Sequence, residues 1–134
     1  KAGSLPKNNK VTKIILDRKV VVDAGNNAGK FLFEVQYMRK AEHLHTKLFA
    51  KIPFPLSGPT YNDRLSSSVY KQPMDLFEIN TYRFLESSLP VKTPRYYFGD
   101  VSNETTNYIL IAERVPFAEI GGRIEGDLAP FQIE

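Results

Sequence analysis

The stretch Lys47-Leu-Phe-Ala-Lys-Ile-Pro-Phe54 places a charged side chain, Lys51, in the middle of a short apolar run. The run follows a polar connector, residues 38 to 46, and predicts a strand over Leu48 to Ile52. Burying an ammonium group without a partner is costly. Two alternatives are open at this point: Lys51 reaches past its strand to solvent, or it meets a carboxylate in the interior.

Composition favours a single domain outside the membrane. A chain of 134 residues that is 42% hydrophobic can bury one core. No run approaches the roughly 18 apolar residues of a membrane span, and the first ten residues lack the apolar centre of a secretory signal. The absence of cysteine excludes disulfides, cysteine zinc sites and thiol catalysis. We therefore expect a cytoplasmic domain, and the start at Lys1 indicates a piece of something longer.

Charge gives no strong indication of a macromolecular partner. The 18 basic residues are interleaved with 15 acidic ones, for a net charge of +3. Specific nucleic-acid binding would be expected to cluster basic residues on one face. We therefore expect neither a specific nucleic-acid partner nor a membrane partner.

The first third of the chain predicts a hairpin. Val11 to Leu16 and Lys19 to Val22 are β-branched runs, Ala24 to Gly29 predicts a flexible turn, and Lys30 to Tyr37 alternates. In that last run Phe31, Phe33, Val35 and Tyr37 fall on one face. The glycine-containing loop is either a plain hairpin turn or a ligand-binding loop.

Residues 53 to 73 contain four prolines and a serine triplet, which predicts a long loop or insertion. A helix is then predicted over residues 74 to 89, ended by Pro90 and Pro94. Its apolar arc contains Met74, Phe77, Tyr82, Phe84, Leu85 and Leu89.

Glu78 interrupts that helix pattern near the middle of the apolar arc. One explanation is local: Asp75-Leu-Phe-Glu78 could be a capping box with Asp75 as N-cap. The other is tertiary: a glutamate on the inner face of the helix and Lys51 on its strand would each remove the cost of burying the other.

A second hairpin is predicted over Arg95 to Val101 and Asn107 to Val115, joined by polar residues. His43 and His45 lie in the connector with no carboxylate pattern beyond Glu42, so no metal site is predicted.

The order of these features resembles the amino-terminal, nucleotide-binding lobe of the protein-kinase-like superfamily. It is most similar to small-molecule kinases of the aminoglycoside phosphotransferase, choline kinase and ecdysteroid-kinase-like type. The similarity rests on Leu48-Phe-Ala-Lys-Ile-Pro53, on Glu78 followed by Tyr82 and Leu85, and on Ile109-Leu-Ile-Ala-Glu113 as the hinge between two lobes.

The resemblance implies an α+β fold: a twisted, mainly antiparallel sheet of about five strands with one principal helix. It implies a kinase-like lobe over residues 11 to 117, with residues 53 to 73 as an insertion. Residues 1 to 10 are expected to be flexible, and residues 118 to 134 to connect to a carboxyl-terminal lobe outside this chain.

The same resemblance implies the roles of individual residues. Lys51 would contact nucleotide phosphates and pair with Glu78, and the glycine loop would lie over the phosphates. The Glu113 carbonyl and the Val115 amide would bind the adenine edge. The implied cofactor-binding residues are Val22, Gly25, Asn26, Asn27, Gly29, Lys51, Glu78, Glu113 and Val115.

The implied activity is ATP-dependent transfer of a phosphoryl group to a hydroxyl of an unidentified small molecule. Magnesium would be held by residues outside this chain, and nothing in the sequence matches the catalytic loop, so no catalytic residue is expected here. Two alternatives are a catalytically dead, kinase-like interaction module and an unrelated basic β-rich binding domain.

Overall fold

The computed structural model describes residues 4–20, 28–55, 57–66 and 68–115. It contains one five-stranded sheet with the strand order β1-β2-β3-β5-β4, and all neighbouring strands are antiparallel. The elements are β1 (Val11–Val20), β2 (Ala28–Tyr37), β3 (Lys47–Pro53), α1 (Tyr61–Leu65), α2 (Gln72–Leu85), η1 (Glu86–Ser88), β4 (Tyr96–Val101) and β5 (Tyr108–Glu113).

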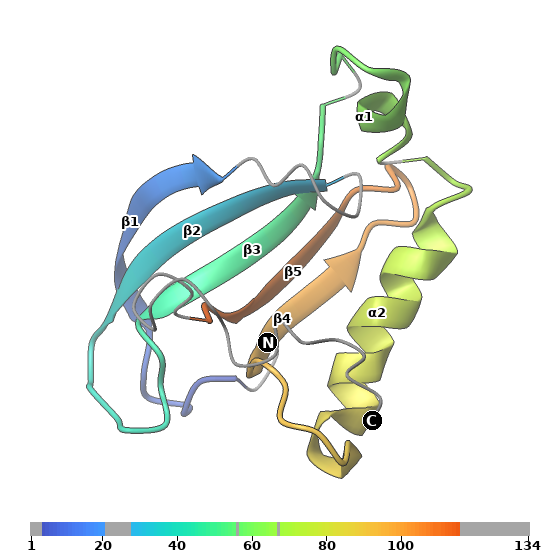
Figure 1. The fold of residues 1–134 in the computed structure, drawn as a ribbon. Coiled ribbons are helices and arrows are strands. Elements are labelled where there is room, and N and C mark those ends of the chain that lie inside the picture. The colour runs from blue at the N-terminus through green and yellow to red at the C-terminus, as the bar shows by residue number, and fades with distance from the viewer. Residues whose placement is uncertain (1–3, 21–27, 56, 67, 116–134) are drawn as a thin grey trace, which may run out of the picture.

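The predicted fold class is confirmed at this level: an α+β fold with an antiparallel five-stranded sheet and few helices. The chain leaves the sheet after β3, forms the helices and returns as the edge strand β4, so that β5 fits between β3 and β4. Figure 1 shows α2 running alongside β4, with α1 beyond the end of β3. The helices therefore lie at one side of the sheet.

One face of the sheet carries the hydrophobic core. Phe33 and Val35 of β2 are buried, as the alternating pattern of that strand predicted, and Leu48 and Ala50 of β3 are buried with them. Tyr97 of β4 joins the same cluster. Since side chains alternate along a strand, the intervening residues of β3, including Lys51, point to the opposite face.

The residues before β1 contact this core side. Leu5 packs against the cluster, and the Ser4 hydroxyl donates to the Tyr97 carbonyl. The Asn9 side chain donates to the Arg39 carbonyl over 2.7 Å and accepts from the Arg39 amide over 2.9 Å. These contacts, which the sequence did not predict, attach residues 4–10 to the core cluster, to β4 and to the residues after β2.

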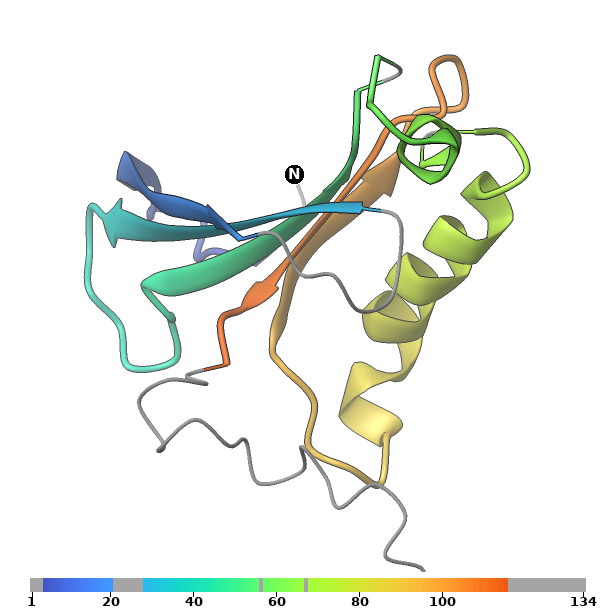
Figure 2. The ribbon, with the colours of Figure 1, turned by 45° about the horizontal axis from the view of Figure 1, so that its top comes forward.

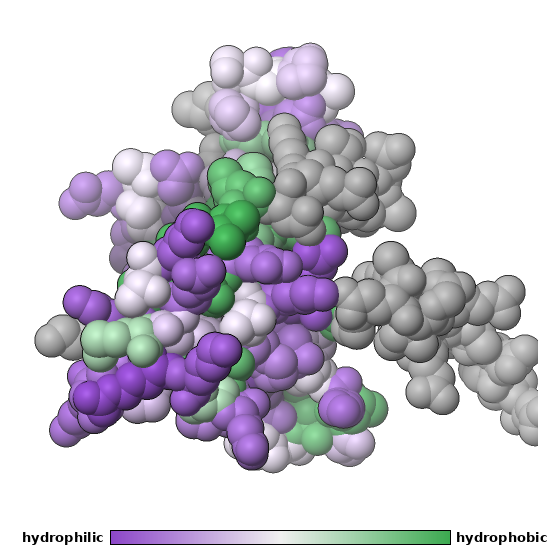
Figure 3. All heavy atoms as spheres, turned by 90° about the vertical axis from the view of Figure 1, so that its left-hand side faces the viewer, coloured by the Kyte–Doolittle hydropathy of each residue, from purple (hydrophilic) through white to green (hydrophobic). Residues whose placement is uncertain are grey.

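Residues 11 to 20 form one strand instead of two runs. The pairing of β1 with β2 changes register between Val11 and Lys13 and again between Leu16 and Arg18, which keeps a single long strand paired. This strand is an edge of the sheet. The side of the molecule nearest β1 is mostly hydrophilic, with hydrophobic side chains in small areas (Figure 3). Charges and register shifts are usual protections of an edge strand.

The predicted loop over residues 53 to 73 is wrong in one respect, because it contains α1. Thr60 and Asp63 form a reciprocal capping box at its N-terminus, with hydrogen bonds of 3.0 and 3.1 Å. The hydroxyl of Ser66 then accepts from the Phe54 amide over 2.7 Å and donates to the Phe54 carbonyl. The buried Ser66 therefore joins the end of this segment to Phe54, the residue that follows β3.

The main helix begins and ends earlier than predicted. It spans Gln72–Leu85 and continues as the short helix η1. Lys71 is its N-cap residue and Pro73 lies in its first turn, a favourable position for proline. Asp75 is therefore inside the helix, and the capping box proposed for Asp75 and Glu78 is wrong.

The predicted inner face of the helix is also wrong. Met74, Phe77 and Phe84 are mostly exposed, Phe77 to 75%, while the buried positions are Asp75 and Ile79. The helix is turned about its axis because Ile79 fits against Gly99 of β4, where a side chain would leave no room. Figure 2 shows α2 on the side of the sheet opposite the connector between β2 and β3. An apolar stripe is thus left facing outward.

Candidate functional site

Lys51 is buried on the helix side of the sheet, with only 4% of its surface exposed. It lies in the middle of β3, opposite Leu110 of β5 on one side and Lys30 of β2 on the other. The alternative in which Lys51 reaches past its strand to solvent is therefore wrong. A buried ammonium group in this position requires a counter-charge.

Glu78 supplies that charge from α2. Its Oε2 lies 2.5 Å from the Lys51 Nζ, which confirms the pairing predicted from the two misplaced charges. The two ends of the pair differ in their surroundings, because the Glu78 side chain is 37% exposed. The Lys51 side of the pair is therefore buried, whereas the Glu78 side is partly exposed.

A second ion pair lies one helical turn away on the same face of α2. The Lys71 Nζ is 3.5 Å from the Asp75 Oδ1, and Asp75 is only 3% exposed. The same ammonium group lies 5.4 Å from the centre of the Tyr108 ring on β5, within range of a cation–π contact. Within the described part of the chain, neither the Lys71 Nζ nor the Tyr108 hydroxyl has a hydrogen-bond partner.

Electrostatic effects join the two pairs into one cluster. Burial lowers the pKa of Lys71; Asp75 opposes that change and Lys51 adds to it. Burial raises the pKa of Asp75, and Lys71 and Lys51 oppose that change. Burial also raises the pKa of Tyr108, with the carboxylates of Asp75 and Glu78 adding to the effect. The pKa values of Lys71 and Asp75 therefore respond to each other and to Lys51.

The sequence contained a signal for this second pair that periodicity analysis missed. Residues 71, 75, 78 and 82 are spaced by four, three and four positions, so they share one face of a helix. The expected helix start at residue 74 left Lys71 outside the element. The apolar residues of the same segment give a stronger periodic pattern than this polar face.

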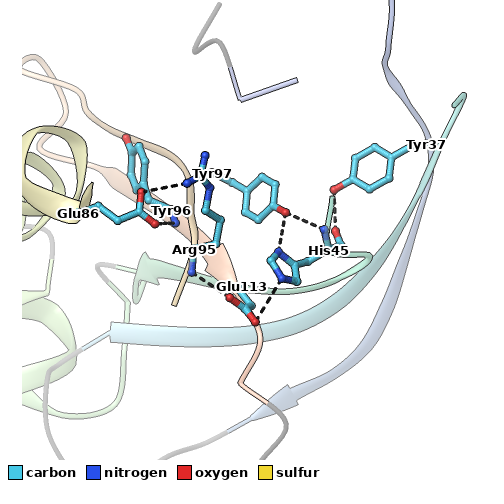
Figure 4. A network of polar contacts seen from close by, with 7 residues as sticks. All are labelled: Tyr37, His45, Glu86, Arg95, Tyr96, Tyr97 and Glu113. Atoms are coloured by element: carbon cyan, nitrogen blue, oxygen red, sulfur yellow. Dashed lines mark hydrogen bonds and ion pairs between the residues drawn. The ribbon is translucent and has the colours of Figure 1, made fainter. Parts of the chain in front are cut away.

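The other end of β5 is held by a separate polar network (Figure 4). The Tyr97 hydroxyl accepts from the His45 amide over 2.7 Å and lies 2.8 Å from the His45 Nδ1. The His45 Nε2 lies 3.4 Å from the Glu113 Oε1. An arrangement in which Tyr97 donates to Nδ1 and Nε2–H donates to Glu113 satisfies all three side chains. The imidazole of His45 therefore links Tyr97 of β4 to Glu113 of β5.

Glu113 also ties β5 to the start of β4. Its Oε2 accepts from the Arg95 amide over 3.1 Å, and its own amide donates to the Arg95 carbonyl over 2.8 Å. Glu86, at the end of the helices, accepts from the Tyr96 amide over 2.9 Å (Figure 4). The side chain of Glu113 therefore helps to join β5 to the start of β4. The predicted role, binding of the adenine edge, concerned its backbone carbonyl.

The structure describes only some of the remaining predicted site residues. Val22, Gly25, Asn26 and Asn27 lie outside the described residues. Gly29 is buried at the start of β2, opposite Ile52, the residue after Lys51. Val115 follows the end of β5.

Along the strands, the predicted adenine and phosphate positions are neighbours. Glu113 pairs with Leu48 and Lys51 with Leu110, so the two predicted positions are three residues apart, about 10 Å along the sheet. Phe49 lies between them on the helix side, opposite Ala112 and Leu32. An aromatic surface therefore separates the ammonium group from the end of β5.

Further groups in the described residues offer no metal centre: no three or more His, Asp or Glu side chains lie close enough together to hold a metal ion. Among the same residues, no helix has both the length and the apolar character needed to cross a membrane.

Comparisons with protein-family models, with curated proteins and with solved structures find no match to this chain.

Proposed function

We propose that residues 11–117 form the nucleotide-binding lobe of a small-molecule kinase of the cytoplasm. The parent protein would transfer a phosphoryl group from ATP to a hydroxyl of its substrate. This chain contributes nucleotide binding and is not catalytic alone, because its sequence offers no catalytic loop.

The observation that carries the proposal is the ion pair of Lys51 and Glu78. An ammonium group inside a sheet is held 2.5 Å from a carboxylate that comes from a helix and remains partly open to solvent. A lysine held in this way has its ammonium group fixed in position, which phosphate binding requires. If the pair served only to stabilise the fold, well-packed apolar residues in its place would often give equal or greater stability.

The chemistry of the surrounding side chains suits a nucleotide. On the helix side of the sheet, the half-buried Phe49 lies opposite Ala112, between Lys51 and the end of β5. Such a surface suits a flat heteroaromatic base. ATP would supply the phosphoryl group, and Lys51 would hold its phosphate oxygens. Magnesium would be held by residues of the other lobe.

One observation favours the second candidate, a kinase-like interaction module without activity. Met74, Phe77 and Phe84 of α2 are exposed on the outer side of the helix. An exposed apolar stripe is typical of surfaces that bind other proteins. In that case the ion pair would serve only to hold α2 in place.

A nucleotide titration separates the two candidates. We expect a non-hydrolysable ATP analogue with magnesium to bind the chain, and Lys51→Ala to weaken binding by about tenfold or more, because a charged hydrogen bond to phosphate is lost. Lys40→Ala is the matched control, since Lys40 is exposed in the connector after β2. Equal affinities of the Lys51→Ala variant and the parent chain, with both shown to be folded, would remove the proposed role.

A further inference from the structure

Lys30 of β2 lies directly opposite Lys51 of β3 in the antiparallel pairing of these strands. Side chains of directly opposed residues point to the same face, with Cβ atoms about 5 Å apart. Lys30 therefore projects toward the face on which Lys51 meets α2. The position differs from that of the core residues Phe31 and Phe33, which alternate with it.

This arrangement places two like charges side by side in the middle of a sheet. Like charges directly opposite each other destabilise a strand pair. Glu78 compensates Lys51, and Asp75 pairs with Lys71. Lys30 is half-buried, and no ion pair involving it occurs among the described residues. Among the described residues, Lys51 and Lys71 of this face each have a carboxylate partner, and Lys30 has none.

We infer that Lys30 and Lys51 together form a two-cation site for a polyphosphate group, that is, for at least two linked phosphoryl groups. Two ammonium groups that come from directly opposed strand residues can contact different phosphoryl groups of a linked pair through charged hydrogen bonds. Assigning that polyphosphate to a nucleotide rests on the proposed function, but binding of the anion itself does not.

The inference gives Lys30→Ala two effects of opposite sign. Without ligand, the variant should melt at the same or a higher temperature than the parent chain, because the repulsion with Lys51 is removed. With ligand, it should bind polyphosphate more weakly. If Lys30 only keeps the strand solvated, Lys30→Ala should change neither the melting temperature nor the affinity for polyphosphate. If Lys30 is needed for folding, the substitution should lower both.

The experiment is a calorimetric titration of the 134-residue chain with inorganic tripolyphosphate, with an ATP analogue and with adenosine. We expect Lys30→Ala to weaken tripolyphosphate binding by about tenfold, an amount typical of one lost charged contact, and Lys30→Arg to retain it. Lys40→Ala, an exposed lysine in the connector, controls for the change in net charge. Adenosine, which has no phosphate, should respond to none of these substitutions.

The outcomes distinguish this inference from the proposed function. Tripolyphosphate bound with equal affinity by the parent chain and by Lys30→Ala, or not bound by the parent chain, overturns the two-cation site. If the ATP analogue binds no better than tripolyphosphate, while Lys30→Ala weakens both, the two-cation site holds and the nucleotide proposal fails. If Lys51→Ala alone weakens the ATP analogue, the nucleotide proposal holds and the inference on Lys30 fails.

Discussion

Ile79 on α2 and Gly99 on β4 are packed so closely that a methyl group built on Gly99 would lie 2.9 Å from the Ile79 Cγ2 and 3.0 Å from its Cγ1. Ile79 is the most buried residue of the helix, with 1% of its surface exposed. Arg83, one turn further on, donates to the Gly99 carbonyl over 2.7 Å. Because Glu78 precedes Ile79, this contact sets how far the carboxylate extends toward Lys51.

Replacing Gly99 by alanine should therefore push α2 away from the sheet. We expect Gly99→Ala to lower the free energy of unfolding by about 1–3 kcal/mol, the usual cost of overpacking a core. Ile79→Ala removes the two nearest carbon atoms that the new methyl group would meet and leaves the Tyr96 Cε2, at 3.2 Å. In chemical denaturation, the double variant should lose less stability than the sum of the two single losses. Strict additivity would show that the two residues are not in contact.

Removing the two members of the ion pair should have unequal costs. Glu78→Ala leaves the ammonium group of Lys51 buried without its partner, and we expect a loss of about 2 kcal/mol, below the 3–5 kcal/mol of fully buried pairs because Glu78 is partly exposed. Lys51→Met keeps the volume and leaves a carboxylate that water can reach, so we expect a loss below about 1 kcal/mol. Urea denaturation measures both. The reverse order would contradict the burial of Lys51, and Glu104→Ala serves as the surface control.

Two buried tyrosines should respond differently to loss of their hydroxyl groups. The Tyr108 hydroxyl has no hydrogen-bond partner within the described residues, so Tyr108→Phe should be neutral or stabilise the chain by up to about 1 kcal/mol. The Tyr97 hydroxyl accepts from the His45 amide and lies beside its ring, so Tyr97→Phe should cost about 1–2 kcal/mol. Thermal unfolding of the two variants provides the comparison. A destabilised Tyr108→Phe would reveal a partner for that hydroxyl.

Tyr37 should make the chain sensitive to alkaline conditions. Burial, with a smaller contribution from Tyr97, raises the pKa of Tyr37 from 10.0 to about 12. A group whose pKa is raised by folding stabilises the fold fully below its unfolded pKa and loses that contribution as the pH rises through its folded pKa. Stability should therefore fall between about pH 10 and 12, and less steeply in Tyr37→Phe. Urea unfolding midpoints measured across this pH range test the effect. If the midpoint falls equally steeply with pH in the parent chain and in Tyr37→Phe, Tyr37 does not contribute to it.

The strands and the Lys51–Glu78 pair were accessible from sequence for related reasons. Alternation of Phe31, Phe33 and Val35 survives in the structure because the core covers one face of the sheet. The pair could be predicted because each charge alone would be costly to bury. Both arguments depend on burial, which leaves a pattern in the sequence.

The orientation of α2 and the polar network at the end of β5 could not be predicted in this way. Hydrophobic periodicity finds the apolar stripe of a helix but not the surface it meets, and here Gly99 admits Ile79 instead. His45 and Tyr97 are 52 residues apart and meet only because β3 and β4 belong to one sheet. The short helix α1 is below the length at which periodicity is informative, although Thr60 and Asp63 carried a capping signal.

The most direct test of the account is an NMR titration that follows the ε-ammonium and ε-methylene signals of Lys51, assigned by comparison with Lys51→Arg. We predict that a non-hydrolysable ATP analogue shifts these signals in a saturable manner, that adenosine does not, and that signals of the exposed Lys40 stay in place. Lys51 signals that remain unchanged while the analogue binds elsewhere on the chain would contradict the claim that this lysine holds the phosphates.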